Sequence, residues 1–160
     1  MYLNSITKLL SFYYNLITII YLIFYIMTEN YDVQVVIDES KIKNRIKELS
    51  SEINKFYTTT TKLLVVGLLR GSFVFIADLA REINVPVEID FMTVSSYGNS
   101  MISSHNVRIL SDLNTDIKNT DVLLVEDIID TGHTLNQVIK MLNEREPKSL
   151  EVCCLLNKSS

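Results

Sequence analysis

The chain has 160 residues, of which 48% are hydrophobic, and its 15 basic and 19 acidic side chains give a net charge of −4. This length is that of one ordinary domain, which buries a core without disulfide or metal staples. A slightly acidic chain without a basic stretch lacks the electrostatic footprint of a nucleic-acid-binding protein, so no nucleic-acid partner is expected.

The first 27 residues form an apolar segment whose only charge is Lys8. The nineteen uncharged residues from Leu9 to Met27 are long enough for a membrane-spanning helix. Three polar side chains dilute the run, however, no cleavage site of small residues follows it, and its composition is typical of a translated AT-rich upstream region. We expect the domain to cover residues 28–160, with Met27 as the true start. A real membrane or interfacial helix at residues 1–27 is the main alternative, and an extra packed helix is a further one.

From Met27 onward, strand-like segments alternate with helix-like segments, which predicts an α/β domain. The first helix is expected to open near Asp38 or Ser40 and to pack one apolar stripe on a sheet. That stripe consists of Ile42, Ile46, Leu49, Ile53 and Phe56.

Residues 62–69 are apolar after their first lysine, as is typical of a buried parallel strand, and a second helix with one apolar face follows a short turn. That face consists of Phe75, Leu79 and Ile83. Residues 87–94 are predicted as the next strand, and their alternation indicates that Glu88 and Asp90 lie on a wetter face. Residues 95–106 are polar and aperiodic, which predicts a mobile loop. Loops of this length often act as lids over a binding site.

Four further segments complete the α/β pattern. Residues 107–110 form a short strand candidate, and residues 121–128 form a strongly apolar strand. A helix is predicted from Thr134 to about Glu144, and the last strand at residues 149–156. The only cysteines, Cys153 and Cys154, are adjacent in that strand, which favours reduced buried thiols and a cytoplasmic location over a disulfide framework.

The segment from Val122 to Leu135 carries the strongest functional signal, because an apolar strand delivers three carboxylates and then a Thr-Gly-His-Thr turn that opens a helix. A helix N-terminus presents unpaired N–H groups and the positive end of the helix dipole, which suits a phosphate. Gly132 allows close approach of the backbone, and the hydroxyls of Thr131 and Thr134 add hydrogen-bond donors.

The three carboxylates occupy two kinds of position. Glu126 and Asp127 lie at the carboxyl end of the strand, where they can hold sugar hydroxyls or a hard divalent cation. Asp130 follows three residues later, where it can take or share a proton of an incoming heterocyclic nitrogen. Acids at the end of an apolar strand also occur in nucleotide hydrolases and receiver domains, but the combination with Thr-Gly-x-Thr and a helix is much more specific.

With this loop the sequence resembles the type I phosphoribosyltransferases, and within them the hypoxanthine-guanine group. Residues 68–72 resemble that group's pyrophosphate loop, residues 90–98 resemble the entry to its flexible lid, and residues 145–158 resemble the strand that ends in its base-reading lysine. The resemblance runs from Met27 to Ser160. It implies a central, mainly parallel sheet flanked by helices, with the ligand over the carboxyl ends of the strands.

The resemblance implies roles for residues on three segments outside the phosphate loop. Arg70 and Gly71 would bind pyrophosphate, beside a non-proline cis peptide bond between Leu69 and Arg70. Ser96 and Tyr97 would close the lid over the reaction, and Lys158 would face the 6-oxygen of the base.

Within the phosphate loop, the resemblance makes Glu126 and Asp127 the residues that serve the ribose and a magnesium ion. Asp130 would be the general base or acid at purine N7. The 5-phosphate would be held by Thr131, Gly132, His133 and Thr134, where His133 contributes its backbone N–H and no catalytic group.

These roles imply a glycosyltransferase of purine salvage. It would transfer the 5-phosphoribosyl group from phosphoribosyl pyrophosphate (PRPP) to hypoxanthine, and also to guanine, with Mg²⁺ as cofactor and with IMP or GMP and pyrophosphate as products. A lysine offers only donors, so it favours a 6-oxo purine over adenine. The family also implies a homo-oligomer, either a dimer or a tetramer, while the use of guanine versus xanthine stays open.

The C-terminus departs from the family pattern, because the family continues for several dozen residues beyond the lysine. In the family this part supplies an aromatic residue that stacks on the base, backbone groups that read its other edge and an aspartate near the metal. Two alternatives to an active enzyme therefore stay open: a truncated PRPP-binding remnant without transferase activity, and a regulator built on the same fold.

Overall fold

The computed structural model describes residues 34–96 and 107–158, and those from Ile37 onward belong to one compact unit. Residues 1–27, for which a membrane helix was one alternative, lie outside the described residues, as does Tyr97. None of the helices within the described ranges combines the length and the apolar character that crossing a bilayer requires.

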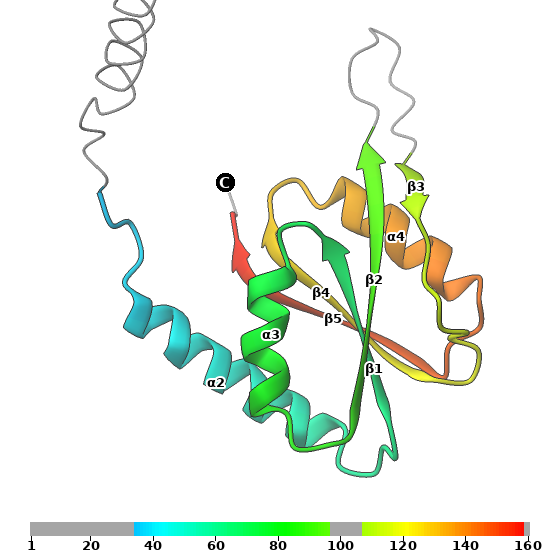
Figure 1. Cartoon of the computed structure of the whole chain (residues 1–160), viewed down its shortest axis with the longest axis horizontal. Helices are drawn as coiled ribbons and strands as arrows, with labels where there is room; N and C mark the ends of the chain where they lie inside the picture. The colour runs from blue at the N-terminus through cyan, green and yellow to red at the C-terminus, as the bar shows by residue number, and fades with distance from the viewer. Residues whose placement is uncertain (1–33, 97–106, 159–160) are drawn as a thin grey trace, which may run out of the picture. The chain divides into compact units, whose positions relative to one another are not determined.

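Within the described residues, three helices and five strands follow the predicted order (Figure 1). In chain order they are α2 (Glu39–Phe56), β1 (Leu63–Leu69), α3 (Phe73–Glu82), β2 (Val87–Ser96), β3 (Val107–Ser111), β4 (Asp121–Ile129), α4 (His133–Asn143) and β5 (Ser149–Asn157). The strands form one sheet in the order β3-β2-β1-β4-β5, in which only β3 pairs antiparallel to its neighbour. The prediction of a mainly parallel sheet flanked by helices is therefore confirmed.

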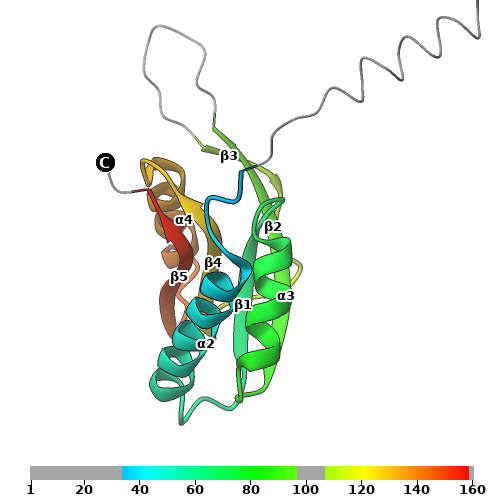
Figure 2. The ribbon, with the colours of Figure 1, turned by 90° about the vertical axis from the view of Figure 1, so that its left-hand side faces the viewer.

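Helices cover both faces of the sheet, with α2 and α3 on one face and α4 on the other (Figure 2). The alternation of a strand sends Leu63 and Val65 of β1 toward α2 and α3, whereas Leu64 and Val66 pack with the residues of α4. Both faces of β1 are thus buried, which explains why its sequence is apolar without interruption.

One predicted face is wrong, because Asp90 of β2 is buried and Ile89 is 41% exposed. The Asp90 carboxylate accepts hydrogen bonds from the backbone N–H groups of Asn114 at 2.7 Å and Thr115 at 2.9 Å. Burial alone would raise the pKa of Asp90, but these donors and the N–H of Phe91 hold it below its usual value. Asp90 therefore anchors the connection between β3 and β4 and does not face water.

Two predicted boundaries also differ from the structure. Phe56, expected in the buried stripe of α2, is 62% exposed because the helix ends there, and Tyr57 takes the buried place instead. Ser95 and Ser96, expected in the loop, belong to β2, because antiparallel pairing with β3 prolongs the strand.

Candidate active site

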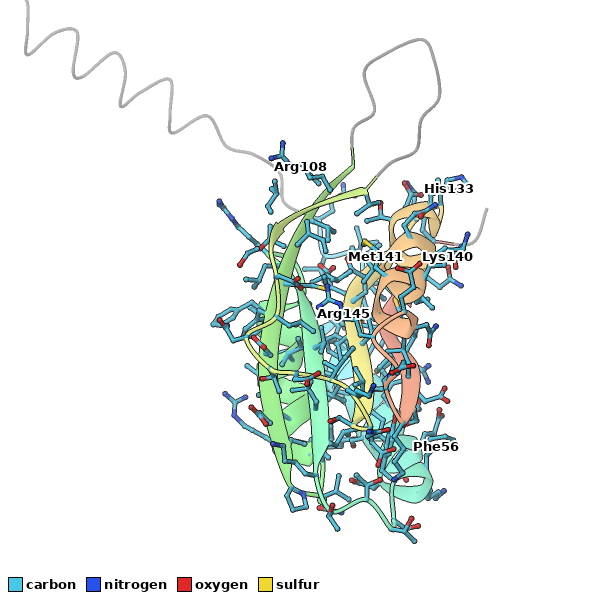
Figure 3. The ribbon with its side chains drawn as sticks, turned by 90° about the vertical axis from the view of Figure 1, so that its right-hand side faces the viewer. Phe56, Arg108, His133, Lys140, Met141 and Arg145 are labelled. Carbon is cyan, nitrogen blue, oxygen red and sulfur yellow. The ribbon has the colours of Figure 1, made fainter. Side chains whose placement is uncertain are left out.

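The two candidate loops meet because β1 and β4 are parallel neighbours in the middle of the sheet. Gly67 of β1 pairs with Val125 of β4, so the turn that follows each strand emerges at the same edge of the sheet. The turn after β1 leads into α3, and the turn after β4 leads into α4. His133 lies at this end of the molecule, whereas Phe56 lies at the opposite end (Figure 3).

A cavity of about 210 Å³ lies at this edge. Of the predicted site residues it brings together Glu126, Asp130, Thr131, Gly132 and Thr134, and its wall is completed by Leu68, Ile128, Ile129 and Leu135. The predicted residues that lie outside its wall are Arg70, Gly71, Asp127, His133 and Lys158. A larger groove of about 450 Å³ between α2 and β5 contains none of the predicted site residues.

The N-terminus of α4 forms one side of this cavity. Gly132, the N-cap residue of α4, adopts the left-handed conformation, with φ at 73°, and makes no side-chain cap. The His133 N–H donates a long hydrogen bond of 3.5 Å to the hydroxyl of Thr131. Because L side chains rarely adopt this φ, glycine is needed for the sharp turn. The turn therefore brings backbone donors and the positive end of the helix dipole to the cavity, as phosphate binding requires.

The Glu126 carboxyl is the most perturbed group of the cavity. Its Oε2 atom is buried and has no hydrogen-bond partner among the described residues. Burial raises the pKa of Glu126 to about 7, and the charge and hydrogen bonding of Asp127 act in the same direction. An unsatisfied acid in a cavity is typical of a ligand-binding group, since a sugar hydroxyl or a cation would supply the missing partner.

The turn after β1 touches the second carboxylate. A Cβ atom added to Gly71 would lie only 2.6 Å from each carboxylate oxygen of Asp127, so the bare backbone of this turn packs directly against that side chain. Arg70 is exposed beside it. The peptide bond between Leu69 and Arg70 is cis, which confirms that prediction. The candidate pyrophosphate turn and the candidate carboxylate pair are thus one contiguous surface.

The donor set fits a magnesium ion that arrives with a phosphorylated ligand. No group of three or more His, Cys, Asp or Glu side chains within residues 34–96 and 107–158 is arranged to hold a metal by itself. Magnesium, however, commonly uses one or two protein carboxylates and completes its shell with water and substrate phosphates. Glu126 and Asp127, one of them with an unpartnered buried oxygen, match that requirement.

The end of β5 reaches the same edge of the sheet. The backbone N–H of Lys158 donates to the carbonyl of Ile129 at 2.8 Å, and the Lys158 ammonium lies 3.6 Å from the Asp130 carboxylate. Both side chains are largely exposed and so remain accessible to a ligand. The candidate base-reading lysine and the candidate general base therefore stand side by side. Of the two predicted lid residues, Ser96 is the last residue of β2 and Tyr97 lies outside the described residues.

Sequence reasoning missed the apolar part of the cavity wall. Leu68, Ile128 and Leu135 belong to apolar runs that the sequence explains as core, and only the three-dimensional arrangement shows that they also face the cavity. Ile128 is 48% exposed. An apolar wall beside convergent polar groups is typical of small-molecule sites.

Comparisons with known proteins show the family to which the chain belongs. The model of the phosphoribosyl transferase domain family matches residues 35–160. A hypoxanthine phosphoribosyltransferase of Haemophilus influenzae is 55% identical over 134 residues, which cover 82% of this chain and 75% of that protein. The crystal structure of a hypoxanthine-guanine phosphoribosyltransferase of Bacillus anthracis is 37% identical, with a TM-score of 0.75 over 81% of this chain and 76% of its own. A hypoxanthine phosphoribosyltransferase of Trypanosoma cruzi, solved as a ternary substrates complex, is 42% identical, with a TM-score of 0.71 over 76% and 70%.

The chain belongs to the phosphoribosyltransferase family and has the type I fold, so it is an enzyme of the glycosyltransferase class. Within that family its relatives of high identity are hypoxanthine phosphoribosyltransferases, which are enzymes of purine salvage.

Proposed function

We propose that this chain transfers the 5-phosphoribosyl group of PRPP to hypoxanthine, and also to guanine, in a magnesium-dependent reaction that yields IMP or GMP and pyrophosphate. The observation that supports this most directly is that the N-terminus of α4 and the carboxyl groups of Glu126 and Asp130 line one cavity of about 210 Å³. The names of the relatives from Haemophilus influenzae and Bacillus anthracis support hypoxanthine and guanine as acceptors.

The phosphate loop would hold the ribose 5-phosphate moiety. Backbone N–H groups of residues 131–134 and the hydroxyls of Thr131 and Thr134 would bind the 5-phosphate, while Glu126 and Asp127 would accept hydrogen bonds from the ribose hydroxyls. Arg70 and the N–H of Gly71 would bind the departing pyrophosphate and stabilise its negative charge. Displacement at the anomeric carbon builds positive character on the sugar, which the neighbouring carboxylates would also stabilise.

Magnesium, when held by Glu126 and Asp127, would neutralise charge on the pyrophosphate. The same two residues would orient the ribose whether or not the metal is bound. Ser96 and Tyr97 would close the site and exclude water, which would otherwise compete with the base for the sugar.

Lys158 and Asp130 would select and activate the base. The Lys158 ammonium offers only donors, so it would donate a hydrogen bond to the 6-oxygen of hypoxanthine or guanine and would disfavour the 6-amino group of adenine. Asp130 would take the proton of N7 as the glycosidic bond forms elsewhere on the imidazole ring. The apolar side chains of Leu68 and Ile128 would offer a surface to the rings of the substrate.

Incubation of the full chain with PRPP, MgCl₂ and hypoxanthine tests the proposal, with IMP separated by chromatography. IMP formation is expected with hypoxanthine and not with adenine, and Asp130→Asn should lower the rate by on the order of a hundredfold or more. Asp78→Asn, at an exposed acid on α3, is the matched control and should leave the rate unchanged. PRPP binding without IMP would favour the binding remnant, and the absence of both would refute the assignment.

Three further proposals accompany this function. We infer a domain boundary near residue 28 and a cytoplasmic location, which the reduced thiols of Cys153 and Cys154 support. We also infer a homo-oligomer, either a dimer or a tetramer. Sedimentation velocity of the full chain would test the last proposal, because a single species of monomer mass at every concentration would contradict it.

A further inference from the structure

Ser72 is a buried polar residue that neither the sequence motifs nor the proposed reaction explains. It stands at the start of α3, directly after Gly71, and its side chain is fully buried. A serine at this position of a helix normally caps it by accepting a backbone N–H of the first turn. Ser72 makes no such cap. Its hydroxyl donates instead to the carbonyl of Leu68, four residues earlier, at 2.7 Å.

This hydrogen bond closes the turn that contains Arg70 and Gly71. The Leu68 carbonyl also receives the Ser72 N–H at 3.4 Å, and the Arg70 carbonyl receives the N–H of Phe73 at 3.4 Å. Both backbone contacts are long, so the short hydroxyl bond is the strongest polar contact across the turn. Without that bond, the two long contacts would be the remaining hydrogen bonds among the described residues that close the turn after β1.

The position of the turn affects both the carboxylate of Asp127 and the wall of the cavity. Gly71 packs against the carboxylate of Asp127, and the side chain of Leu68 lines the cavity beside Glu126 and Asp130. A shift of the turn by a few tenths of an ångström would therefore move backbone donors relative to the carboxylate pair. Well-placed donors stabilise developing charge only when they are held in place before the ligand arrives.

We propose that Ser72 is a positioning residue for diphosphate binding: its hydroxyl, bonded to Leu68, holds the Arg70–Gly71 backbone against Asp127 in a conformation ready for pyrophosphate. The proposal rests on the proposed function of this turn. Ser72 touches no substrate in this account and acts only through the backbone that it holds.

The test is a calorimetric titration of the full chain with inorganic pyrophosphate in MgCl₂, combined with initial rates of IMP formation. Ser72→Ala should weaken pyrophosphate binding and raise KM for PRPP by on the order of five- to tenfold, the effect of one net hydrogen bond. KM for hypoxanthine should change less than about twofold, since the base contacts another part of the site. Ser72→Cys keeps the side-chain size with a weaker donor, so an intermediate loss is expected, and it carries the test if the alanine variant does not fold.

Ser50→Ala is the matched control. Ser50 is also buried, and its hydroxyl donates to the Lys47 carbonyl at 2.9 Å, but it lies in α2 away from the turn. It should lose stability without losing pyrophosphate affinity. If Ser72→Ala behaves in the same way, or raises both KM values equally, Ser72 is merely structural and the proposal is overturned. A wild-type chain that binds pyrophosphate without forming IMP would refute the proposed function alone, whereas one that binds no pyrophosphate would refute both.

Discussion

Replacing Glu126 by Gln should stabilise the ligand-free chain above about pH 7. Burial and the neighbouring Asp127 raise the pKa of Glu126 from 4.5 to about 7, so the folded chain holds this proton more tightly than the unfolded chain. The protonated carboxyl is compatible with folding at low pH. The stabilising contribution of the Glu126 proton is therefore complete below about pH 4.5. It decreases as the pH rises and is absent above about pH 7, where the carboxylate is charged in both the folded and the unfolded chain.

The pKa difference sets the size of the effect. A change of this size in pKa corresponds to at most about 3 kcal/mol. Because the side chain is only partly buried, solvent screening reduces the expected gain for Glu126→Gln to about 1–2 kcal/mol. For a chain of this length, each kcal/mol raises Tm by about 2–4 °C.

Urea unfolding at about pH 5 and about pH 8 measures this gain. The difference in unfolding free energy between Glu126→Gln and wild type should be small at the lower pH and should grow at the higher pH. Glu144→Gln, at an exposed acid after α4, is the control and should follow wild type at both values. If the Gln variant is no more stable than wild type at about pH 8, ionisation of the buried Glu126 carboxyl does not destabilise the folded chain and the reasoning is refuted.

Three other changes test separate parts of the molecule. Gly67→Ala should lower stability in urea by about 1–3 kcal/mol, because the added Cβ would lie 2.3 Å from Ile76 Cδ1 in a close-packed core. Asp90→Asn should also cost about 1–3 kcal/mol, since an amide nitrogen would face backbone donors, and no loss would mean that these bonds add nothing net. Lys158→Met should raise KM for hypoxanthine by on the order of tenfold in initial-rate assays and KM for PRPP much less, so equal increases would contradict base recognition.

The sheet was predictable because burial requires recognisable patterns of apolar residues in the sequence. The continuous apolar runs of β1 and β4 indicate strands covered on both faces, and helical stripes such as that of α4 indicate what covers them. Asp90 was misplaced for a physical reason. A carboxylate is expected to face water, and only the backbone donors of Asn114 and Thr115, brought there by a distant loop, make its burial favourable.

The candidate site also has a part that the sequence predicts and a part that it does not. The local form of residues 126–134 was predictable because its parts are consecutive: the end of a strand, a turn with glycine and the start of a helix. Contacts between segments were not. The packing of Gly71 on Asp127 depends on the pairing of β1 with β4. The hydrogen bond from Ser72 to Leu68 depends on a helix start in which the serine does not cap the helix. A polar residue after Arg70–Gly71 is compatible with any turn, so only the three-dimensional structure shows that the Ser72 hydroxyl donates to the Leu68 carbonyl.

Features that are unfavourable for folding lie together at one end of the sheet, and a bound ligand would offset two of them. Glu126 has a buried oxygen without a partner, α4 begins without a side-chain cap, and Gly132 adopts a left-handed conformation. Each of these features costs free energy in the ligand-free chain. Hydroxyls or a cation would satisfy Glu126, and a phosphate would satisfy the first turn of α4, so one phosphorylated sugar with its metal would offset these costs together. An arrangement selected for stability alone would not concentrate them around one cavity, which is why binding of such a ligand explains this end of the molecule better than folding does.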